Sequence, residues 1–504
     1  MNTFLNGLKT ANSFGLTENG GIKRTTTGSA LLDMFAMGAA FRTRSEEDCI
    51  LLFKNAYEEN PVYALKCLFY IADCRGGQGE RRFFRVITRW LAQNELEAMR
   101  RNLVHIPIYR RWDDILTFVG TPLQKEALDF LKNQLALDVQ SKTPSLLAKW
   151  LPSENTSSQK TRELAAIVRK HFGFTPRQYR KTLSILRARI NVLETLMSAN
   201  RWDEIEFDKI PSKAGLKYKN AFARHDIERM KKNPEVKSYE EFAKDTTTKV
   251  NAKTLYPYEV VDKAVNLMGS FYRKNNTSMD NTDRLMINKY WENLEDYFKN
   301  DEFNMLAVVD TSASMRGYDA SAPINVAISL GIYCAERAKG PFAGYYVSFS
   351  GQPRLVKVEG VDFCDKVKRI YDANLCQNTN IEATFDMLLQ TARKNNCSQN
   401  DLPKNLVIIS DMEFDGTAYT NSGRFNRTVM ETIEKKWNAY GYKMPNLVFW
   451  NVQARSNNIP MEAKDGVSLV SGMSPSIFKS VMTGKTASDL MYEALDQERY
   501  SVIK

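Results

Sequence analysis

The residues best suited to chemistry in this chain follow a short apolar run, "MLAVVD" (305–310). Asp310 ends the run, and Ser312 and Ser314 follow at alternate positions. Because alternate residues of an extended segment point to one side, these three side chains can present oxygen atoms to one point. Hard oxygen donors of this kind suit Mg²⁺ or Mn²⁺. The alternative is that Asp310 and the serines only cap the turn that follows.

Two residues farther along the chain could belong to the same site. Thr379 lies in a polar loop before a helical pattern, and Asp411 ends a second apolar run, "NLVIISD" (405–411). No general base or nucleophile accompanies them, and a carboxylate-based metal hydrolase would gather more acids around its cation. The set therefore favours metal-mediated binding over catalysis, and we expect no enzymatic activity. A metal nuclease is kept as a further hypothesis.

An α/β domain over residues 301–504 is predicted to position this site. The expected strands are 305–310, 344–350, 354–360, 405–411, 446–452 and 466–472. The expected helices are 323–339, 381–395, 424–441, 475–484 and 487–497. Nearly continuous apolar strands alternating with helices predict a doubly wound, mostly parallel sheet covered on both faces. Ligands of such sheets bind at the carboxyl ends of the strands, beside a topological switch point, and Asp310 and Asp411 both end predicted strands.

The segment before this domain has a helical pattern. Apolar residues recur at three- and four-residue spacing, for example over 29–42, 60–75, 80–95 and 121–139. We therefore predict an N-terminal arm (1–27) and an all-α domain (28–300), giving an α + α/β fold class. Helical hairpins stacked in a HEAT-like array are expected, with a compact helical bundle as the alternative.

Charge is distributed unevenly between these two parts. Residues 1–300 hold 48 lysines and arginines against 36 acids, a net of +12, whereas residues 301–504 hold 22 against 23. Such asymmetry indicates an anionic partner for the N-terminal part, most often a nucleic acid. Charge that serves only solubility is the alternative.

Other features of the composition narrow the class of protein. The seven cysteines are scattered and the three histidines lie far apart, which argues against a disulfide framework and against a zinc site. No apolar run is long enough for a membrane span or for a signal-peptide core. We expect a cytoplasmic, monomeric protein without a membrane partner.

Two basic segments are candidates for contact with RNA phosphates. Residues 160–190 carry nine basic residues and one acid, and aromatic or imidazole side chains stand among them. The candidate residues there are Arg169, Lys170, His171, Arg177, Tyr179, Arg180, Lys181 and Arg187. A solvated helix face is the alternative. The second segment is a glycine-rich loop followed by Arg81 and Arg82, which could bind phosphate or simply connect two helices.

The order of Asp310, Ser312, Ser314, Thr379 and Asp411 resembles the metal-ion-dependent adhesion site of von Willebrand factor A domains. The resemblance implies that the three hydroxyls bind a Mg²⁺ or Mn²⁺ ion directly. It implies that the two aspartates hold the water molecules of that ion. A carboxylate from a partner protein commonly completes the coordination in such domains.

A basic helical segment followed by an A domain also resembles the Ro autoantigen family, whose helical module is called TROVE. A closer resemblance is to a Ro-like family without an assigned activity, carried by "SLLAKWLPSENTSS" (145–158), "YRKTLSILRARINVLETLMSANRWDEIEFDKIPSKAG" (179–215), "MPNLVFWNVQAR" (444–455) and "SLVSGMSPSIFK" (468–479). Ro implies a ring of HEAT-like repeats closed by the A domain, which binds single-stranded RNA ends and small structured RNAs. We therefore expect a non-enzymatic RNA-binding protein with a cation site, or alternatively a scaffold that recruits a carboxylate-bearing protein through the cation.

Overall fold

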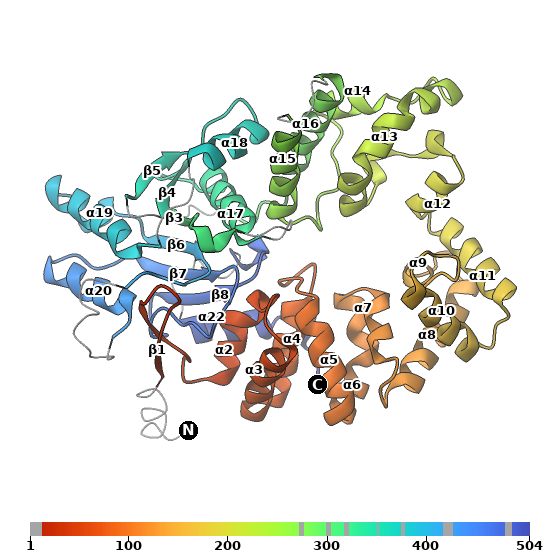
Figure 1. Cartoon of the computed structure of the whole chain (residues 1–504), viewed down its shortest axis with the longest axis horizontal. Helices are drawn as coiled ribbons and strands as arrows, with labels where there is room; N and C mark the ends of the chain where they lie inside the picture. The colour runs from red at the N-terminus through yellow and green to blue at the C-terminus, as the bar shows by residue number, and fades with distance from the viewer. Residues whose placement is uncertain are drawn as a thin grey trace. The chain divides into compact units, whose positions relative to one another are not determined.

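The computed structural model describes most of the chain (Figure 1). The described residues are 13–271, 277–298, 304–316, 322–349, 352–373, 379–416, 427–478 and 486–504. They form two compact units, which we describe separately. The sheet unit contains residues 1–83 and 252–501, and the helical unit contains residues 84–251 and 502–504. No helix among the described residues is long and apolar enough to cross a membrane.

A six-stranded sheet forms the centre of the sheet unit. Its strands are β3 (Met305–Asp310), β4 (Tyr345–Phe349), β5 (Arg354–Lys357), β6 (Asn405–Ser410), β7 (Asn446–Asn451) and β8 (Val467–Ser471). They lie in the order β5-β4-β3-β6-β7-β8, and every pair is parallel except β4 with β5. Each of the six apolar runs forms a strand, which confirms the predicted mostly parallel sheet. The order reverses between β3 and β6, and this is the switch point of the fold.

Helices of the C-terminal part cover this sheet. They are α17 (Pro323–Arg337), α18 (Phe363–Ala373), α19 (Ile381–Lys394), α20 (Val429–Ala439) and α22 (Ala487–Leu495). In Figure 1, α17 and the pair α19 and α20 lie on opposite sides of the strands. A Cβ on Gly331 of α17 would lie 2.5 Å from Val309, so this glycine lets the helix approach β3 closely. The sequence pattern did not predict α18, and the expected helix at 475–484 is described only as far as Phe478.

Segments far from the sheet in sequence complete the sheet unit. They are the hairpin β1 (Phe14–Leu16) and β2 (Ile22–Arg24), and the helices α2 (Ala30–Met37), α3 (Glu46–Glu59), α4 (Pro61–Ala72), α15 (Pro257–Phe271) and α16 (Thr277–Glu292). Helix α2 packs on β8, where the Ser471 hydroxyl donates to the Phe35 carbonyl oxygen at 3.3 Å. Buried Asp73 accepts from the Tyr500 hydroxyl at 3.0 Å and pairs with Arg499. The sheet unit therefore includes residues from both sides of position 300, where the sequence pattern changes.

The helical unit has only helices and connecting loops among its described residues. It contains most of α5 (Arg82–Asn94), with α6 (Leu96–Asn102), α7 (Ile106–Tyr109), α8 (Gln124–Gln140), α9 (Leu147–Trp150), α10 (Gln159–Phe172), α11 (Pro176–Arg189), α12 (Leu193–Ser198), α13 (Ser212–Lys232) and α14 (Tyr239–Lys244). This confirms the helical character predicted for the region. Buried Asp114 joins two segments, pairing with Arg85 at 2.5 Å and with Arg110 at 3.1 Å.

The turn between α10 and α11 shows how the local sequence fixes the basic segment. Gly173 ends α10 in the left-handed region with φ 77°, a conformation that glycine adopts without strain. Thr175 then begins α11 through a capping box with Gln178, and Pro176 occupies the first helical position. "GFTPRQ" is therefore a helix stop followed directly by a helix start.

Candidate functional site

The two strands beside the switch point bring together the two aspartates predicted as metal-site residues. Asp310 is the last residue of β3, and Asp411 directly follows β6. The paired strands are parallel, so both carboxylates reach the same edge of the sheet. Both residues are fully buried. The sequence therefore located the two acids correctly at the carboxyl ends of adjacent central strands.

The loop after β3 folds the two serines back toward Asp310. One carboxylate oxygen of Asp310 accepts from the Ser312 backbone N–H at 2.9 Å, and the other accepts from the Ser410 hydroxyl at 2.5 Å. The hydroxyls of Ser312 and Ser314 lie 2.9 Å apart. The capping alternative is thus partly realised, because Asp310 does cap the loop. The same loop nevertheless brings two hydroxyl oxygens together beside the acid.

Thr379 is held to the loop that follows β6. Its carbonyl oxygen accepts from the Asp415 N–H at 3.0 Å, and the charge of Asp415 adds to the rise that burial causes in the pKa of Asp310. The intervening Met412 has φ 65°, in the left-handed region that a methionine rarely adopts. Strained backbone of this kind persists where its surroundings impose it, often beside a functional site. Asp310 therefore ends β3, and the other four predicted metal-site residues lie in the segments that follow β3 and β6 or precede α19, at the same edge of the sheet.

Burial of two carboxylates gives this edge unusual electrostatics. Burial raises the pKa of Asp411 to about 7; the charge of Asp310 adds to this rise, and Arg455 opposes it. The pKa of Asp310 is also raised, chiefly by burial. In the part of the chain that the structure describes, the Oδ2 atom of Asp411 has no hydrogen-bond partner, although the Arg455 Nε atom lies 3.4 Å away. A buried pair of acids with an unsatisfied oxygen is deficient in positive charge.

The donor atoms fit a hard divalent cation. They are carboxylate and hydroxyl oxygens, the ligands that Mg²⁺ and Mn²⁺ prefer. Among the described residues, no three side chains of His, Cys, Asp or Glu group as metal ligands do. A cation here would depend on the hydroxyls of Ser312, Ser314 and Thr379, with Asp310 and Asp411 supplying negative charge. Sites for zinc or copper, which favour imidazole or thiolate ligands, are a poor match.

A second set of residues at this edge was not predicted from the sequence. The turn between β1 and β2 lies against the candidate site, where the Asn19 side-chain amide donates to the Thr379 hydroxyl at 3.0 Å. Arg455, in the loop after β7, pairs with Glu18 at 3.0 Å and donates to the Ser314 carbonyl oxygen. The motif "TENGG" (17–21) signals a turn, but nothing in the sequence indicates where that turn docks.

Several of the predicted RNA-contact residues are engaged within the helical unit. Arg169 pairs with Glu154 at 2.7 Å, and Arg180 pairs with the same carboxylate at 3.4 Å. His171 contacts the Asp129 carboxylate at 2.7 Å. These contacts join α10 and α11 to their neighbours, which gives the three side chains a structural role.

Two further candidates are internal. Tyr179 is 0% exposed, and its hydroxyl donates to the Pro152 carbonyl oxygen at 2.9 Å, so the ring has no free face on which a base could stack. The Arg187 guanidinium donates to the carbonyl oxygens of Ala148 and Leu151 at 2.8 and 2.9 Å. The sequence pattern placed these two residues on a charged face because it could not show the loop that covers them.

Three of the candidate cations remain available at the surface. Lys170, Arg177 and Lys181 are exposed, and they have no ion-pair partner in the part of the chain that the structure describes. They lie on α10 and α11, which belong to the unit that holds all of the excess positive charge. The helical unit has 32 lysines and arginines against 20 acids, a formal charge of +12.

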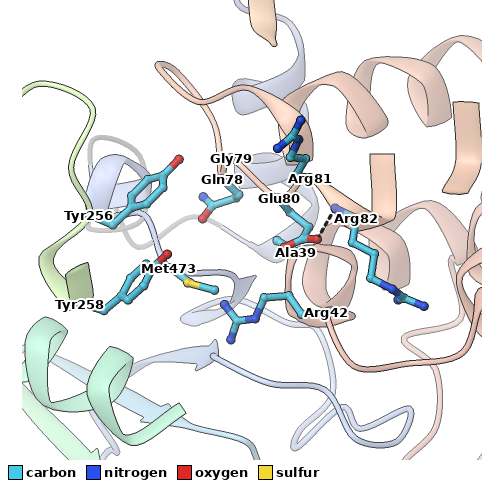
Figure 2. A pocket seen from close by; sticks show the side chains of 10 residues that line it. All are labelled: Ala39, Arg42, Gln78, Gly79, Glu80, Arg81, Arg82, Tyr256, Tyr258 and Met473. Carbon is cyan, nitrogen blue, oxygen red and sulfur yellow. Dashed lines mark hydrogen bonds between the residues drawn. The ribbon is translucent and has the colours of Figure 1, made fainter. Parts of the chain in front are cut away.

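Arg81 and Arg82 belong to the sheet unit and line a separate pocket of about 280 Å³ (Figure 2). Glu80 accepts the Arg82 N–H at 2.8 Å, so its carboxylate caps the start of α5. Tyr256 and Tyr258 line the pocket on the other side, with ring centroids 6.0 Å apart. The loop therefore does more than connect two helices, because it forms one wall of an aromatic and basic pocket.

Comparison with known proteins divides the chain into two matched regions. Residues 17–111 and 157–301 match a Domain of unknown function (DUF2828), and residues 304–501 match a Domain of unknown function (DUF7788). The chain is also 31% identical over 512 residues to "Uncharacterized protein L728" of Acanthamoeba polyphaga mimivirus, covering 94% of this chain and 85% of that protein. The chain therefore belongs to the same family as this mimivirus protein and carries a DUF2828 region followed by a DUF7788 domain.

Proposed function

We propose that the sheet unit is a cation-dependent binding module of the von Willebrand factor A kind, in a protein of Ro type. The observation that carries this proposal is the pair of buried acids, Asp310 and Asp411, at the carboxyl ends of the two adjacent strands beside the switch point. Ser312, Ser314 and Thr379 would bind Mg²⁺ or Mn²⁺ through their hydroxyls, and a carboxylate from a partner would complete the coordination. The resemblance to Ro rests on architecture, a helical region followed by such a sheet, since the matching families are domains of unknown function.

Binding is favoured over catalysis by the state of Glu413, one of the two acids that follow Asp411 in the chain. Glu413 is fully buried, and its carboxylate accepts from the Glu18 N–H at 2.8 Å and from the Ser456 hydroxyl at 2.6 Å. A carboxylate tied in this way is poorly placed to take a proton from water. The proposal includes a reducing, cytoplasmic location, in keeping with the free thiols of the six described cysteines.

Calorimetry with Mg²⁺, and Mn²⁺ binding followed by electron paramagnetic resonance, test the cation site. Replacing both Ser312 and Ser314 by alanine removes two of the three direct ligands, and we expect the affinity to fall at least tenfold. Ser501→Ala, an exposed serine of the same unit, is the matched control. A full-length protein that binds neither ion at millimolar concentration contradicts the proposal.

RNA binding by the helical unit is a second candidate function, favoured by its formal charge of +12. A charge reversal of Lys170, Arg177 and Lys181 should weaken RNA binding. If each neutralises one phosphate, the slope of log affinity against log salt should fall by about two for single strands. Filter binding of a single-stranded RNA over a salt series measures both quantities.

The control for this experiment reverses three exposed lysines elsewhere in the same unit, Lys132, Lys142 and Lys231. Equal losses in the two triple variants would show that net charge alone matters. Salt-independent binding of the unmodified protein would exclude phosphate contacts as the source of affinity.

The scaffold alternative, in which the cation recruits a protein carboxylate, predicts a different partner. Affinity capture from cells with and without nuclease, and with and without EDTA, distinguishes the two. Protein that survives nuclease but is released by EDTA supports the scaffold. Turnover of labelled RNA with Mg²⁺ or Mn²⁺ would support the nuclease hypothesis.

A further inference from the structure

The N-terminal hairpin, residues 14–24, docks on the candidate cation site through its turn. The Thr17 hydroxyl donates to the Phe414 carbonyl oxygen at 2.6 Å, and the Asn19 amide donates to the Glu413 carbonyl oxygen at 2.7 Å. A Cβ on Gly21 would lie 2.5 Å from the Phe414 carbonyl oxygen, so the turn approaches the backbone of the loop directly. Backbone atoms and short side chains make these contacts, so the turn packs closely against the loop.

Within this turn, Asn19 contacts a predicted cation ligand. The Asn19 side-chain amide donates to the Thr379 hydroxyl at 3.0 Å, and the Asn19 carbonyl oxygen accepts from the Gly416 N–H at 3.2 Å. A hydroxyl oxygen can accept such a bond through one lone pair and retain another for a cation. Asn19 is therefore a positioning residue that orients Thr379, in the way that outer residues commonly orient metal ligands.

The neighbouring residue, Glu18, brings a carboxylate to the same edge. Its side chain is 50% exposed and pairs with Arg455 at 3.0 Å, while Arg455 in turn lies 3.4 Å from Asp411. One guanidinium thus spans the distance from the Glu18 carboxylate to the unsatisfied oxygen of Asp411. Two further acids follow Asp411 in the chain: Glu413 is fixed by Ser456 and by the Glu18 N–H, and the Asp415 backbone N–H donates to the Thr379 carbonyl oxygen.

We infer that the Glu18 carboxylate completes the coordination of the cation. The partner of the site is then the chain's own N-terminal hairpin. The inference rests on the proposed cation site. It assigns to Glu18 the role that a partner protein's carboxylate has in other A domains, and it makes hairpin docking and cation binding mutually reinforcing. A protein or peptide carboxylate from outside would then reach the cation only after the hairpin leaves.

Cation affinity and hairpin exchange test this inference together. In the full-length protein, Glu18→Gln keeps the size of the side chain but removes its charge, and we expect Mn²⁺ affinity to fall about tenfold. Hydrogen exchange of residues 14–24 should slow when Mg²⁺ is added to the unmodified protein, and this slowing should disappear in Glu18→Gln. Glu47→Gln, an exposed acid of the same unit, controls for the change in net charge.

The outcomes distinguish a failure of this inference from a failure of the proposed cation site. If the unmodified protein binds no cation, the cation site itself is refuted. If it binds Mn²⁺ with the same affinity as Glu18→Gln, and Mg²⁺ leaves hairpin exchange unchanged, the site stands and the role of Glu18 is refuted. If added Mg²⁺ speeds hairpin exchange, the hairpin competes with the cation, and the inference fails as well.

Discussion

Replacing Asp411 by asparagine should reveal how much stability the sheet unit loses because two acids are buried together. Burial and the charge of Asp310 raise the pKa of Asp411 from 3.8 to about 7. When the pKa of a carboxyl is higher in the folded protein than in the unfolded chain, the protein loses stability as the pH rises from the unfolded pKa through the folded pKa. At pH 8 the ionised Asp411 therefore costs the sheet unit up to about 4 kcal/mol, the free-energy equivalent of this pKa difference.

Asp411→Asn removes that cost and retains the shape of the side chain. Its amide oxygen can still accept the Glu413 N–H, a bond that Asp411 makes at 3.3 Å. Without a divalent cation, the variant should therefore be more stable than the unmodified protein at pH 8. With Mg²⁺ at a hundred times its dissociation constant, the unmodified protein should gain about 2.7 kcal/mol, and the variant should gain little.

Hydrogen exchange of the β3 and β6 amides at pH 8, in EDTA and in Mg²⁺, measures the local stability around the two acids. A local measure is preferable because a chain with two compact units need not unfold in one step. The reasoning is refuted if Asp411→Asn exchanges faster than the unmodified protein in EDTA. It is refuted equally if both proteins respond alike to Mg²⁺.

Three further predictions concern residues away from the cation site. Burial raises the pKa of Asp33 to about 6, so the free energy of unfolding should fall by up to about 3 kcal/mol between pH 4 and pH 7, and Asp33→Asn should remove this fall in chemical denaturation. Asp114→Ala leaves Arg110 with a buried, uncompensated charge and should destabilise the helical unit by about 3–5 kcal/mol, measured by the exchange of α5 and α8 amides. Tyr179→Phe removes one buried hydrogen bond and should cost about 1 kcal/mol while leaving RNA affinity unchanged; a loss of affinity without a loss of stability would show that the hydroxyl contacts RNA.

The sheet and its acids were predictable because their signal is local. Six apolar runs of strand length, alternating with helices, correspond to six strands. The position of an acid at the end of a buried strand is fixed by that strand. The spacing of Asp310, Ser312 and Ser314 also grouped these side chains correctly, although for another reason than an extended segment, because Ala313–Met315 form a 3-10 turn that keeps the Ser314 hydroxyl beside that of Ser312. Thr379 needed the resemblance to a known motif, because nothing local ties it to the others.

The rest depended on contacts between residues far apart in the chain. Glu18 and Asn19 belong to what the sequence shows as an ordinary turn, and only the fold brings Asn19 to Thr379 and Glu18 to Arg455. Tyr179 and Arg187 fit a basic helix face, but the loop around Pro152 covers them. Sequence patterns describe which side of a helix is polar, and they do not show whether another segment covers that side.

The packing of α2 on β8 has a consequence for synthesis of the chain. Phe35 and Ser471 are 436 residues apart, so at ordinary rates the ribosome needs roughly 20 to 90 seconds to make the second after the first. During that time the face of α2 that packs on β8 has no partner and is exposed to aggregation or to chaperones. Once residue 251 is made, the helical unit lacks only residues 502–504. It can therefore fold well before the sheet unit, most of which is made later.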